Sequence, residues 1–259
     1  MISVIIPTLN ADERFAACLT ALVPAAVEGV VREVIVVDAG STDHTLKIAD
    51  QAGVDVVVSE AGRGLQLRAG ARRARQPWLL FLHADTVLSP GWDIEAVEFM
   101  ERVDNGRHRP MAATFSFGLD DYGAAPRILE WLVAMRGLLL GLPYGDQGLL
   151  IPRQLYDEVG GFQPMPLMED VAIVRRIGRR RIWRLRAGAV TGSSRYRAEG
   201  YLRRVMRNQL CIALYAAGVS PARIANFYAN GAHEPRNAEA PRSATDAAPP
   251  ERRRRVNSA

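Results

Sequence analysis

The first hundred residues of this 259-residue chain alternate between two kinds of segment. Short runs that are β-branched or wholly apolar occur at Ile2–Ile6, Glu33–Val37, Val54–Val58 and Trp78–Leu82. Segments with helical spacing lie between these runs, at Asp12–Val27, Asp43–Ala52 and Leu65–Arg75. Strands that are apolar on both faces and alternate with helices predict an α/β fold, in which a mostly parallel, Rossmann-like sheet is flanked by helices. A ligand crevice is expected beyond the carboxyl ends of the strands.

Beyond about residue 90 this alternation stops. Further helices are predicted at Gly91–Val103, Ile128–Leu142, Glu169–Ile177 and 199–217, and further strands at Met111–Gly118, Leu149–Ile151 and Arg181–Leu185. Residues 231–259 are rich in Ala, Pro, Glu and Arg without periodicity, which predicts a disordered tail. We therefore expect a single domain over residues 1–230 with a helical C-terminal segment.

The cysteine content and the distribution of charge indicate the cellular compartment and the kind of binding partner. Only Cys18 and Cys211 are present, both within apolar helical patterns, so a disulfide framework is not expected and a reducing, cytoplasmic compartment is. The apolar start reads as a buried first strand, not as a signal peptide. The net charge is +5, and residues 175–207 hold twelve arginines and one acid, Glu199. Such a block suits phosphates or an anionic membrane surface, and a merely solvated face is the alternative.

One apolar helical segment raises the question of a membrane. Ile128–Leu142 is too short and too interrupted by Arg136 to span a bilayer. It is predicted to be core, or a helix that lies on the membrane surface close to an acceptor with a lipid tail.

Acidic residues follow two of the predicted strands. Asp38 ends the run Val34–Val37 and is followed by Ala39-Gly40-Ser41-Thr42-Asp43, where glycine permits a sharp turn. His83-Ala84-Asp85 ends the run Leu79–Leu82, and its alternation places His83 and Asp85 on one side of an extended chain. Both carboxylates could face the crevice, Asp85 as a ligand of a hard cation. They could instead be a turn residue and a helix cap.

Two more polar clusters lie in the second half. Glu169 and Asp170 follow Met168 at a predicted helix start, where they could complement the helix dipole or serve as a general base. Asp146 and Gln147 form a polar knot between apolar segments, which suggests a buried polar network.

The segment Gly62-Arg63-Gly64 is weaker evidence for a binding site. Its glycines permit close backbone approach and its arginine can pair with phosphate. It does not match the dinucleotide-binding pattern, and no Walker A sequence is present.

In this order the segments resemble the family 2 glycosyltransferases of the GT-A fold over roughly residues 2–228. The resemblance is carried by Pro7-Thr8-Leu9-Asn10, Val37–Asp43, Gly62–Gly64, His83–Asp85 and Glu169-Asp170. More narrowly, Gly141–Gly148 with Pro166–Asp170 is similar to the radical-SAM/selenodomain-associated transferase 2 subgroup. The resemblance implies that residues 1–110 bind a nucleotide-sugar and that residues 111–230 form the acceptor part.

The resemblance also implies roles for single residues. The implied donor-nucleotide residues are Pro7, Thr8, Asn10, Glu13, Asp38, Gly62, Arg63, Gly64 and Ala84. Asp85, with His83, would bind Mg²⁺ or Mn²⁺; Asp170 would be the catalytic base, oriented by Glu169. Asp146, Gln147 and Met168 would line the acceptor pocket. Two departures stand out: His83 replaces the first acid of Asp-x-Asp, and Ala11 stands where many relatives have Glu, which leaves Asp12 or Glu13 as substitutes.

The resulting prediction is an inverting, metal-assisted transfer from a nucleoside-diphosphate sugar, by family preference a UDP-sugar, to a small or lipid-linked hydroxyl acceptor. A sugar nucleotidyltransferase is the nearest alternative, but Pro7–Asn10 replaces its glycine-rich loop. A non-catalytic nucleotide-binding or membrane-associated protein is another. Nucleic acid is not an expected partner, because no aromatic and basic recognition motif is present. The expected location is cytoplasmic, with peripheral contact to the anionic inner face of the membrane.

Overall fold

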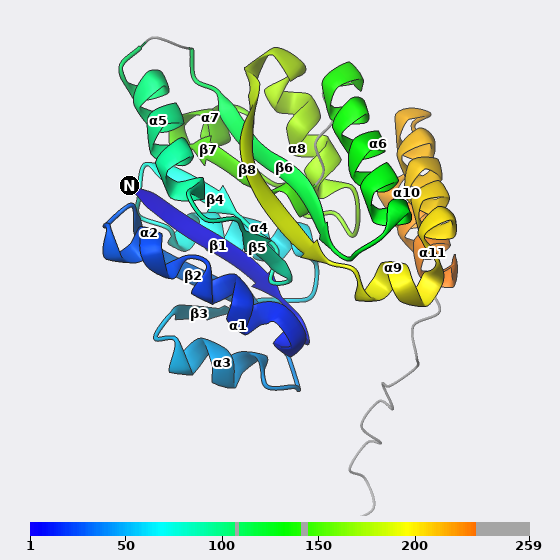
Figure 1. The fold of residues 1–259 in the computed structure, drawn as a ribbon, viewed down its shortest axis with the longest axis horizontal. Helices are drawn as coiled ribbons and strands as arrows, with labels where there is room; N and C mark the ends of the chain where they lie inside the picture. The colour runs from blue at the N-terminus through cyan, green and yellow to red at the C-terminus, as the bar shows by residue number, and fades with distance from the viewer. Residues whose placement is uncertain (107–108, 141–144, 232–259) are drawn as a thin grey trace, which may run out of the picture.

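An eight-stranded sheet runs through the residues that this computed structural model describes, which are 1–106, 109–140 and 145–231 (Figure 1). Its order is β3-β2-β1-β4-β7-β6-β8-β5. The strands are β1 (Ile2–Thr8), β2 (Val31–Asp38), β3 (Asp55–Val58), β4 (Trp78–Phe81), β5 (Thr86–Leu88), β6 (Ala112–Asp120), β7 (Leu149–Pro152) and β8 (Ile182–Gly192). The first four strands pair in parallel, whereas β7 is antiparallel to both β4 and β6.

The α-helices cover both faces and one end of this sheet. They are α1 (Asp12–Thr20), α2 (Val23–Val27), α3 (Thr45–Gln51), α4 (Arg63–Arg73), α5 (Trp92–Asp104), α6 (Ala124–Leu140), α7 (Arg153–Glu158), α8 (Glu169–Ile177), α9 (Ser194–Glu199), α10 (Tyr201–Ala216) and α11 (Pro221–Gly231). Two short 3-10 helices, η1 (Gly145–Gln147) and η2 (Arg179–Arg181), complete the described elements.

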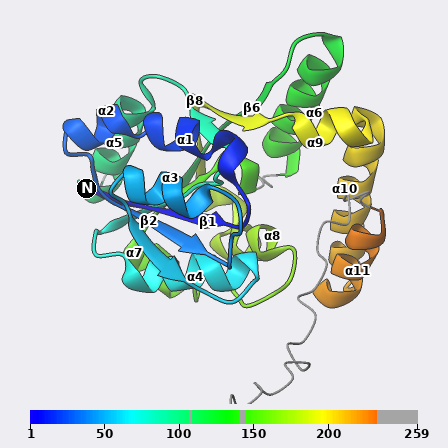
Figure 2. The ribbon, with the colours of Figure 1, turned by 90° about the horizontal axis from the view of Figure 1, so that it is seen from below.

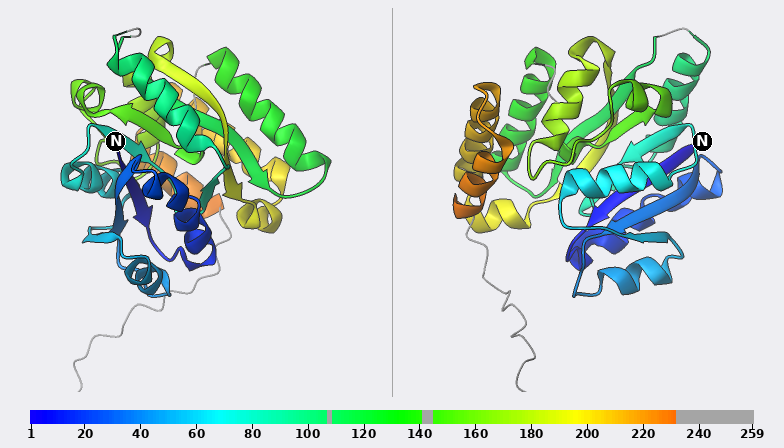
Figure 3. Two further views of the ribbon diagram at one scale, coloured as in Figure 1. Left: turned by 60° about the vertical axis from the view of Figure 1, so that its left-hand side comes forward. Right: turned by 180° about the vertical axis from the view of Figure 1, so that it is seen from behind.

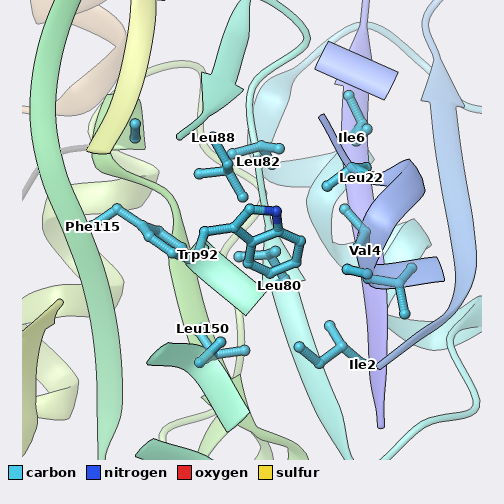
Figure 4. Close-up of a cluster of buried hydrophobic side chains, with 14 of the residues drawn as sticks. Ile2, Val4, Ile6, Leu22, Leu80, Leu82, Leu88, Trp92, Phe115 and Leu150 are labelled. Carbon is cyan, nitrogen blue, oxygen red and sulfur yellow. The ribbon is translucent and has the colours of Figure 1, made fainter. Parts of the chain in front are cut away.

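Strand alternation divides the core into two clusters, one on each face of the sheet. Ile2, Val4 and Ile6 of β1 point to the face covered by α1, α2, α3 and α5, where Trp92 lies among the strand side chains (Figure 4). Ile5 points to the opposite face, which α4, α7 and α8 cover. Because both faces are covered there, the central strands β1, β4 and β7 are buried along almost their whole length, as the sequence predicted for β1 and β4.

Helices α6, α9, α10 and α11 gather at one end of the molecule (Figures 1, 2 and 3). Helix α6 packs against the start of α10 through Leu129 and Val133, which form a cluster with Tyr196, Phe117, Tyr201 and Val205. Helix α8 joins α10 and α11 through a second cluster that contains Met168, Cys211 and Ile224. The predicted helical C-terminal segment is thus confirmed.

Glu33 on β2 lies at the amino-terminal end of the parallel strands, near the starts of β1 and β4. Its buried carboxylate accepts a hydrogen bond from Ser3 Oγ (2.6 Å) and two from Arg75, through the backbone N (2.6 Å) and Nε (3.0 Å). Burial opposes ionisation, but these bonds outweigh it and lower the pKa of Glu33. The cluster is remote from the carboxyl ends of the strands and is therefore structural.

The observed elements correct the sequence interpretation in several places. The segment predicted as one helix at Asp12–Val27 is divided into α1 and α2, and residues 199–217 contain the end of α9 and then α10. Strand β8 extends to Gly192, and the sequence did not predict β5, α7, α11, the two 3-10 helices or the part of α9 before Glu199. Within the described residues, four strand pairings are parallel and three antiparallel. The predicted tail from residue 232 onward and the motif residues 141–144 lie outside the described residues.

The arginine block is mostly tied to the protein itself. Arg176 donates to the carbonyl groups of Val159, Gly161 and Ala172, and Arg181 donates to Glu158. Other members of the block pair with acids on neighbouring elements: Arg197 with Asp121, and Arg204 and Arg207 with Glu199. The block is therefore not one solvated face. Among the described helices none is long and apolar enough to cross a membrane.

Candidate active site

The order of the strands fixes where a ligand can enter. Strands β2 and β3 lie on one side of β1, whereas β4 lies on the other. Loops after β1 and β4 therefore leave the sheet in opposite directions, and a crevice forms at this switch point beyond the carboxyl ends of the strands. Thr8, Asp38 and His83 all lie at or just beyond these ends.

Asp38 is buried (1% exposed) and organises the loop that follows β2. One carboxylate oxygen accepts from Thr8 Oγ1 (2.9 Å) and Ser41 Oγ (2.5 Å), and the other from the backbone N of Gly40 (2.9 Å) and Ser41 (2.8 Å). Burial opposes ionisation, but these hydrogen bonds lower the pKa of Asp38. The carboxylate thus joins the ends of β1 and β2; its predicted contact with the nucleoside stays a prediction.

Two other side chains form hydrogen bonds at the carboxyl ends of β1 and β2. Asn10, with φ +50°, accepts from the backbone N of Thr42 (2.9 Å), which connects the loop after β1 to the loop after β2. Gln66 is buried on α4 and donates from Nε2 to the carbonyl oxygens of Thr8 (2.9 Å) and Val37 (2.8 Å). Sequence reasoning missed Gln66; the signal was a lone polar residue beside Leu67 on the buried face of α4.

A pocket with about 420 Å³ of open space lies beyond β4. Its walls combine one apolar side with five polar or charged side chains from four distant parts of the sequence. The lining residues are Arg63, Leu67, Phe81, Leu82, His83, Thr114, Gly148, Leu149, Phe162, Glu169, Asp170, Ile173 and Val174. We call it the acid pocket. The structure therefore brings together His83, Glu169, Asp170 and Arg63, whereas Asp38 and Asp85 do not line this pocket. The roles predicted for all of them stay predictions.

Arg63 at the start of α4 is surrounded by acids. Its Nε lies 3.6 Å from Oε1 of Glu169, which is 2% exposed. Desolvation opposes the charge of Arg63, but the carboxylates of Glu169, Asp146, Asp170 and Asp85 raise its pKa. Burial and then the charge of Asp170 raise the pKa of Glu169, while Arg63 acts in the opposite direction. Arg63 thus pairs with Glu169 and lies within the electrostatic influence of three further carboxylates, a surplus of negative charge that a divalent cation would offset.

Asp170 differs from its neighbour in accessibility. It is half-buried on the pocket wall and accepts from the backbone N of Val171 (2.7 Å). Met168, which directly precedes Glu169 and Asp170, has a φ of +69°, which is unusual for a residue other than glycine. Asp170 can therefore reach a bound hydroxyl, whereas Glu169 is enclosed beside Arg63.

The donor set around His83 and Asp85 fits a divalent cation that shares its ligands with a diphosphate. His83 Nδ1 lies 3.2 Å from Asp146 Oδ1. Because an ionised carboxylate only accepts, Nδ1 is assigned the proton, which leaves Nε2 as an acceptor that could bind a cation. The Asp85 carboxylate receives one long hydrogen bond, from Thr86 Oγ1 (3.5 Å). Among the described residues no three His, Cys, Asp or Glu side chains form a metal cluster by themselves, so diphosphate oxygens and water would complete the coordination.

Asp146 is ionised in this arrangement. Burial would favour its neutral form, but the hydrogen bond and charge of His83, with the charges of Arg63 and Arg204, hold its pKa well below the usual range. Its side chain is 39% exposed. Asp146 is therefore bonded to His83, and the buried Gln147 donates from Nε2 to the Phe115 carbonyl (3.1 Å), but the Asp146 side chain is not buried as predicted.

Two residues that support Asp85 were missed by sequence reasoning. Arg14 on α1 donates from Nε to the Asp85 carbonyl (3.3 Å) and pairs with Asp120. Thr191 on β8 lies 3.2 Å from Thr86, Oγ1 to Oγ1, and donates to the Asp146 carbonyl at 3.4 Å. The pairing of β5 with β8 brings Thr191 beside Thr86, and the position of α1 brings Arg14 to the Asp85 carbonyl; both partners are far away along the chain.

Other predicted residues lie outside the acid pocket. Ala84 and Met168 are buried in apolar clusters, and Glu13 is exposed on α1. Pro7 is half-buried at the end of β1. A Cβ on Gly64 would lie 2.2 Å from the carbonyl oxygen of Gln163, so that this glycine permits close approach to the loop before α8. The roles of these residues in donor or acceptor binding stay predictions.

Comparison with solved structures identifies the fold. Glucosyl-3-phosphoglycerate synthase from Mycobacterium tuberculosis, in complex with Mn²⁺, UDP and glucosyl-3-phosphoglycerate, matches with a TM-score of 0.54 and 22% identity over 73% of this chain and 70% of that chain. S. aureus TarS 1-349 matches with a TM-score of 0.58 and 19% identity over 89% of this chain and 71% of that chain. The protein has the GT-A glycosyltransferase fold.

Sequence comparison adds the family for part of the chain. Residues 3–108 match the model of glycosyl transferase family 2. An uncharacterized glycosyltransferase from Mycobacterium tuberculosis and one from Mycobacterium bovis are each 32% identical over 115 residues, which is 43% of this chain. The chain matches about half the length of these curated relatives (50%). The predicted resemblance to family 2 glycosyltransferases is therefore confirmed over residues 3–108, while the radical-SAM-associated subgroup stays a prediction.

Proposed function

We propose that this protein transfers a sugar from a nucleoside-diphosphate sugar to a hydroxyl acceptor, with inversion at the sugar carbon. The observation that carries the proposal is the acid pocket, where Arg63, His83, Glu169 and Asp170 meet at the switch point of a GT-A sheet. A nucleotidyltransferase would need a phosphate-binding glycine-rich loop after β1, and Pro7–Asn10 does not provide one.

The donor is proposed to lie across the ends of β1, β2 and β4. The loops that Asp38 and Asn10 hold together would enclose the nucleoside, and Arg63 would face the diphosphate. UDP is the proposed nucleotide, since the M. tuberculosis synthase with the same fold binds UDP and Mn²⁺.

Asp85 and His83 would hold Mg²⁺ or Mn²⁺. When bound, the cation would neutralise the negative charge that builds up on the leaving diphosphate. Arg63, close to the same acids, would add a fixed positive charge at this position.

Asp170 is proposed as the general base. It would accept the acceptor's hydroxyl proton while the oxygen attacks the sugar carbon, from the face opposite the diphosphate. A positioned base of this kind typically contributes ~10²–10⁴-fold in rate. Glu169 would orient Arg63 and shape the pocket without itself accepting the proton, because it is enclosed.

The proposal is tested first by donor binding. Thermal-shift titrations with UDP-, GDP- and dTDP-sugars, each with and without Mn²⁺, should show the largest stabilisation with one UDP-sugar and Mn²⁺, because a ligand raises stability in proportion to ln(1 + [L]/Kd). Absence of stabilisation by every nucleotide-sugar would refute the donor assignment.

Asp170→Asn then separates binding from chemistry. This substitution keeps the shape of the side chain but removes the basic oxygen, so that turnover should fall at least ~10²-fold with donor affinity unchanged. Near-normal turnover in that variant would remove Asp170 from the mechanism.

We also propose a cytoplasmic location with peripheral contact to an anionic membrane. Helix α10 exposes Leu202, Met206 and Leu210 together with Arg203, and α6 exposes Trp131. Co-sedimentation tests this contact: more protein should be recovered with phosphatidylglycerol vesicles than with phosphatidylcholine vesicles. Equal recovery with the two lipids, or no recovery with either, would refute it.

A further inference from the structure

Helix α1 lies against β5, beside the loop that carries the proposed metal ligands (Figure 1). Two side chains on one face of this helix donate hydrogen bonds to main-chain carbonyl groups of that loop. Arg14 donates from Nε to the carbonyl of Asp85 (3.3 Å), and Cys18 donates from Sγ to the carbonyl of His83 (3.4 Å). Because residues four apart lie on the same face of a helix, α1 holds both ends of the segment His83–Asp85. The arginine is the stronger donor, since a thiol donates only weakly.

The Asp85 carboxylate depends on this hold on its main chain. Among the described residues, its side-chain hydrogen bond is the long one from Thr86 Oγ1 (3.5 Å). The loop is closed by a bond from the Thr86 backbone N to the His83 carbonyl (3.1 Å). The orientation of the Asp85 peptide group therefore sets the direction of its carboxylate, and Arg14 fixes that peptide group from α1.

Arg14 is itself held by the last residue of β6. Its Nη1 pairs with the carboxylate of Asp120, and its side chain is 21% exposed. The Asp120 carbonyl in turn accepts hydrogen bonds from Ser193 Oγ (2.8 Å) and Arg197 Nη2 (3.3 Å) at α9. Pairing with Asp120 also compensates the positive charge of Arg14, so that this charge does not oppose a cation at Asp85.

Strand β8 leaves room for the stem of the same arginine. Gly192 is the last residue of β8, and a Cβ built on it would lie 2.8 Å from Arg14 Cδ. The stem of Arg14 is therefore packed against the main chain of β8. Contacts from the loop after β4 and from the ends of β6 and β8 thus converge on one side chain of α1.

We propose that Arg14 is a positioning residue for the metal site, which fixes Asp85 through its main chain, and that Asp120 acts through Arg14. The inference rests on the proposed function, in which Asp85 is a ligand of the divalent cation. Arg14 bonds to the carbonyl group of Asp85 and not to its carboxylate. Its loss should therefore weaken the part of UDP binding that depends on Mn²⁺ and leave the remainder unchanged.

The first test is calorimetric titration of UDP, with and without Mn²⁺. Arg14→Met keeps an apolar stem and removes both donors. It should weaken UDP binding roughly 10–100-fold when Mn²⁺ is present, the usual cost of losing a residue that orients a metal ligand, with Mn²⁺-free affinity unchanged. An equal effect of Mn²⁺ in wild-type and Arg14→Met protein would overturn the proposal.

Arg153→Met is the matched control. Arg153 also donates to main-chain carbonyl groups, those of Ala71, Ala74 and Gln76, but at the opposite end of β4. This variant should have a lower Tm and an unchanged effect of Mn²⁺ on UDP binding. The same loss in Arg153→Met as in Arg14→Met would show a general effect of destabilisation and refute the specific role.

Two glycine substitutions on β8 displace Arg14 without removing it. Gly192→Ala should reduce the effect of Mn²⁺ on UDP affinity, because the new Cβ meets the stem of Arg14. Gly188→Ala on the same strand should not, since its nearest neighbour lies at 3.6 Å. Equal Mn²⁺ dependence in these two variants would contradict the hold on Asp85.

A double-mutant cycle tests the part assigned to Asp120. Asp120→Asn alone should weaken Mn²⁺-dependent UDP binding, whereas in the Arg14→Met background it should cause no further loss, because residues that act through one contact are not additive. Additive losses would show that Asp120 reaches the site by another route and would refute the coupling.

A measurement on the metal-free protein separates this inference from the proposed function. Amide hydrogen exchange at Thr86 should be about tenfold faster in Arg14→Met than in wild-type protein, and unchanged in Arg153→Met, because the Thr86 N–H closes the loop that Arg14 holds. UDP binding that is independent of Mn²⁺ in wild-type protein would refute the proposed function, while the exchange rates still decide whether Arg14 fixes the loop. Equal exchange at Thr86 in wild-type and Arg14→Met protein would overturn the inference itself.

Discussion

Replacing Gly64 by alanine should disturb the active site while adding only one methyl group. Gly64 lies in the first turn of α4, immediately after Arg63, and faces the loop that leads to α8. A Cβ at this position would lie 2.2 Å from the carbonyl oxygen of Gln163, whereas ordinary contacts begin at 3.4 Å. The two backbone segments must therefore separate by about 1.2 Å, since a carbonyl group cannot rotate away as a flexible side chain can.

That displacement acts on both charged partners of the pocket. It moves Arg63 and the loop before Glu169 apart, although their side chains now lie 3.6 Å from each other. Misplacement of catalytic groups by about 1 Å can cost roughly 10²-fold in rate, and overpacking typically costs about 1–3 kcal/mol of stability. We therefore expect Gly64→Ala to remain folded, with a lower Tm and a kcat reduced by roughly 10²-fold.

Gly188→Ala is the matched control. A Cβ on Gly188 would meet its nearest neighbour at 3.6 Å, so this second Gly→Ala change should leave both Tm and kcat almost unchanged. Steady-state transfer assays measure kcat, and thermal unfolding measures Tm, for the two variants. Normal turnover and stability in Gly64→Ala would show that the close approach to Gln163 does not position the pocket.

Two other substitutions test separate parts of the account. Asp146→Asn removes the charged partner of His83 and should weaken Mn²⁺-dependent UDP binding ~10–100-fold; calorimetry that shows unchanged binding would exclude His83 from the metal site. Glu33→Gln should destabilise the fold by about 1.5–3 kcal/mol near neutral pH, because an amide cannot reproduce all the hydrogen bonds that the ionised carboxylate accepts from Ser3 and Arg75. Since the pKa of Glu33 is lowered on folding, its contribution is present above the unfolded pKa and is lost as the pH falls through the folded pKa. Urea unfolding should therefore show the two proteins converging only under acidic conditions, and a difference that grows with falling pH would contradict this role.

The first half of the fold could be predicted because each strand and helix there has a local signature. Ile2–Thr8 and Trp78–Phe81 are buried on both faces, and such runs of apolar residues identify parallel strands without tertiary information. Strand β5 could not be found in this way, because its three residues depend on pairing with β8 far along the chain.

In the active site, too, residues with a local sequence signature could be predicted, and residues that depend on distant contacts could not. Asp85 and Asp170 were recognisable because each stands in a motif with neighbours of known type, and the pocket confirms that Asp170 shares a wall with His83. The contacts of Arg14 and Thr191 depend on where distant segments meet, so their local sequence carries no signal for them. Asp38 illustrates a third case: its position was predicted, but its four hydrogen bonds to its own loops became visible only in the structure.

The central claim is that one site combines a nucleoside diphosphate, a divalent cation and the base Asp170. Calorimetric titration of UDP, with and without Mn²⁺, tests it most directly when wild-type, Asp85→Ala and Asp170→Asn proteins are compared. Mn²⁺ should tighten UDP binding at least tenfold in the wild-type and Asp170→Asn proteins, and should have no effect in Asp85→Ala. UDP affinity that is independent of Mn²⁺ in the wild-type protein, or equally dependent on it in Asp85→Ala, would contradict the account.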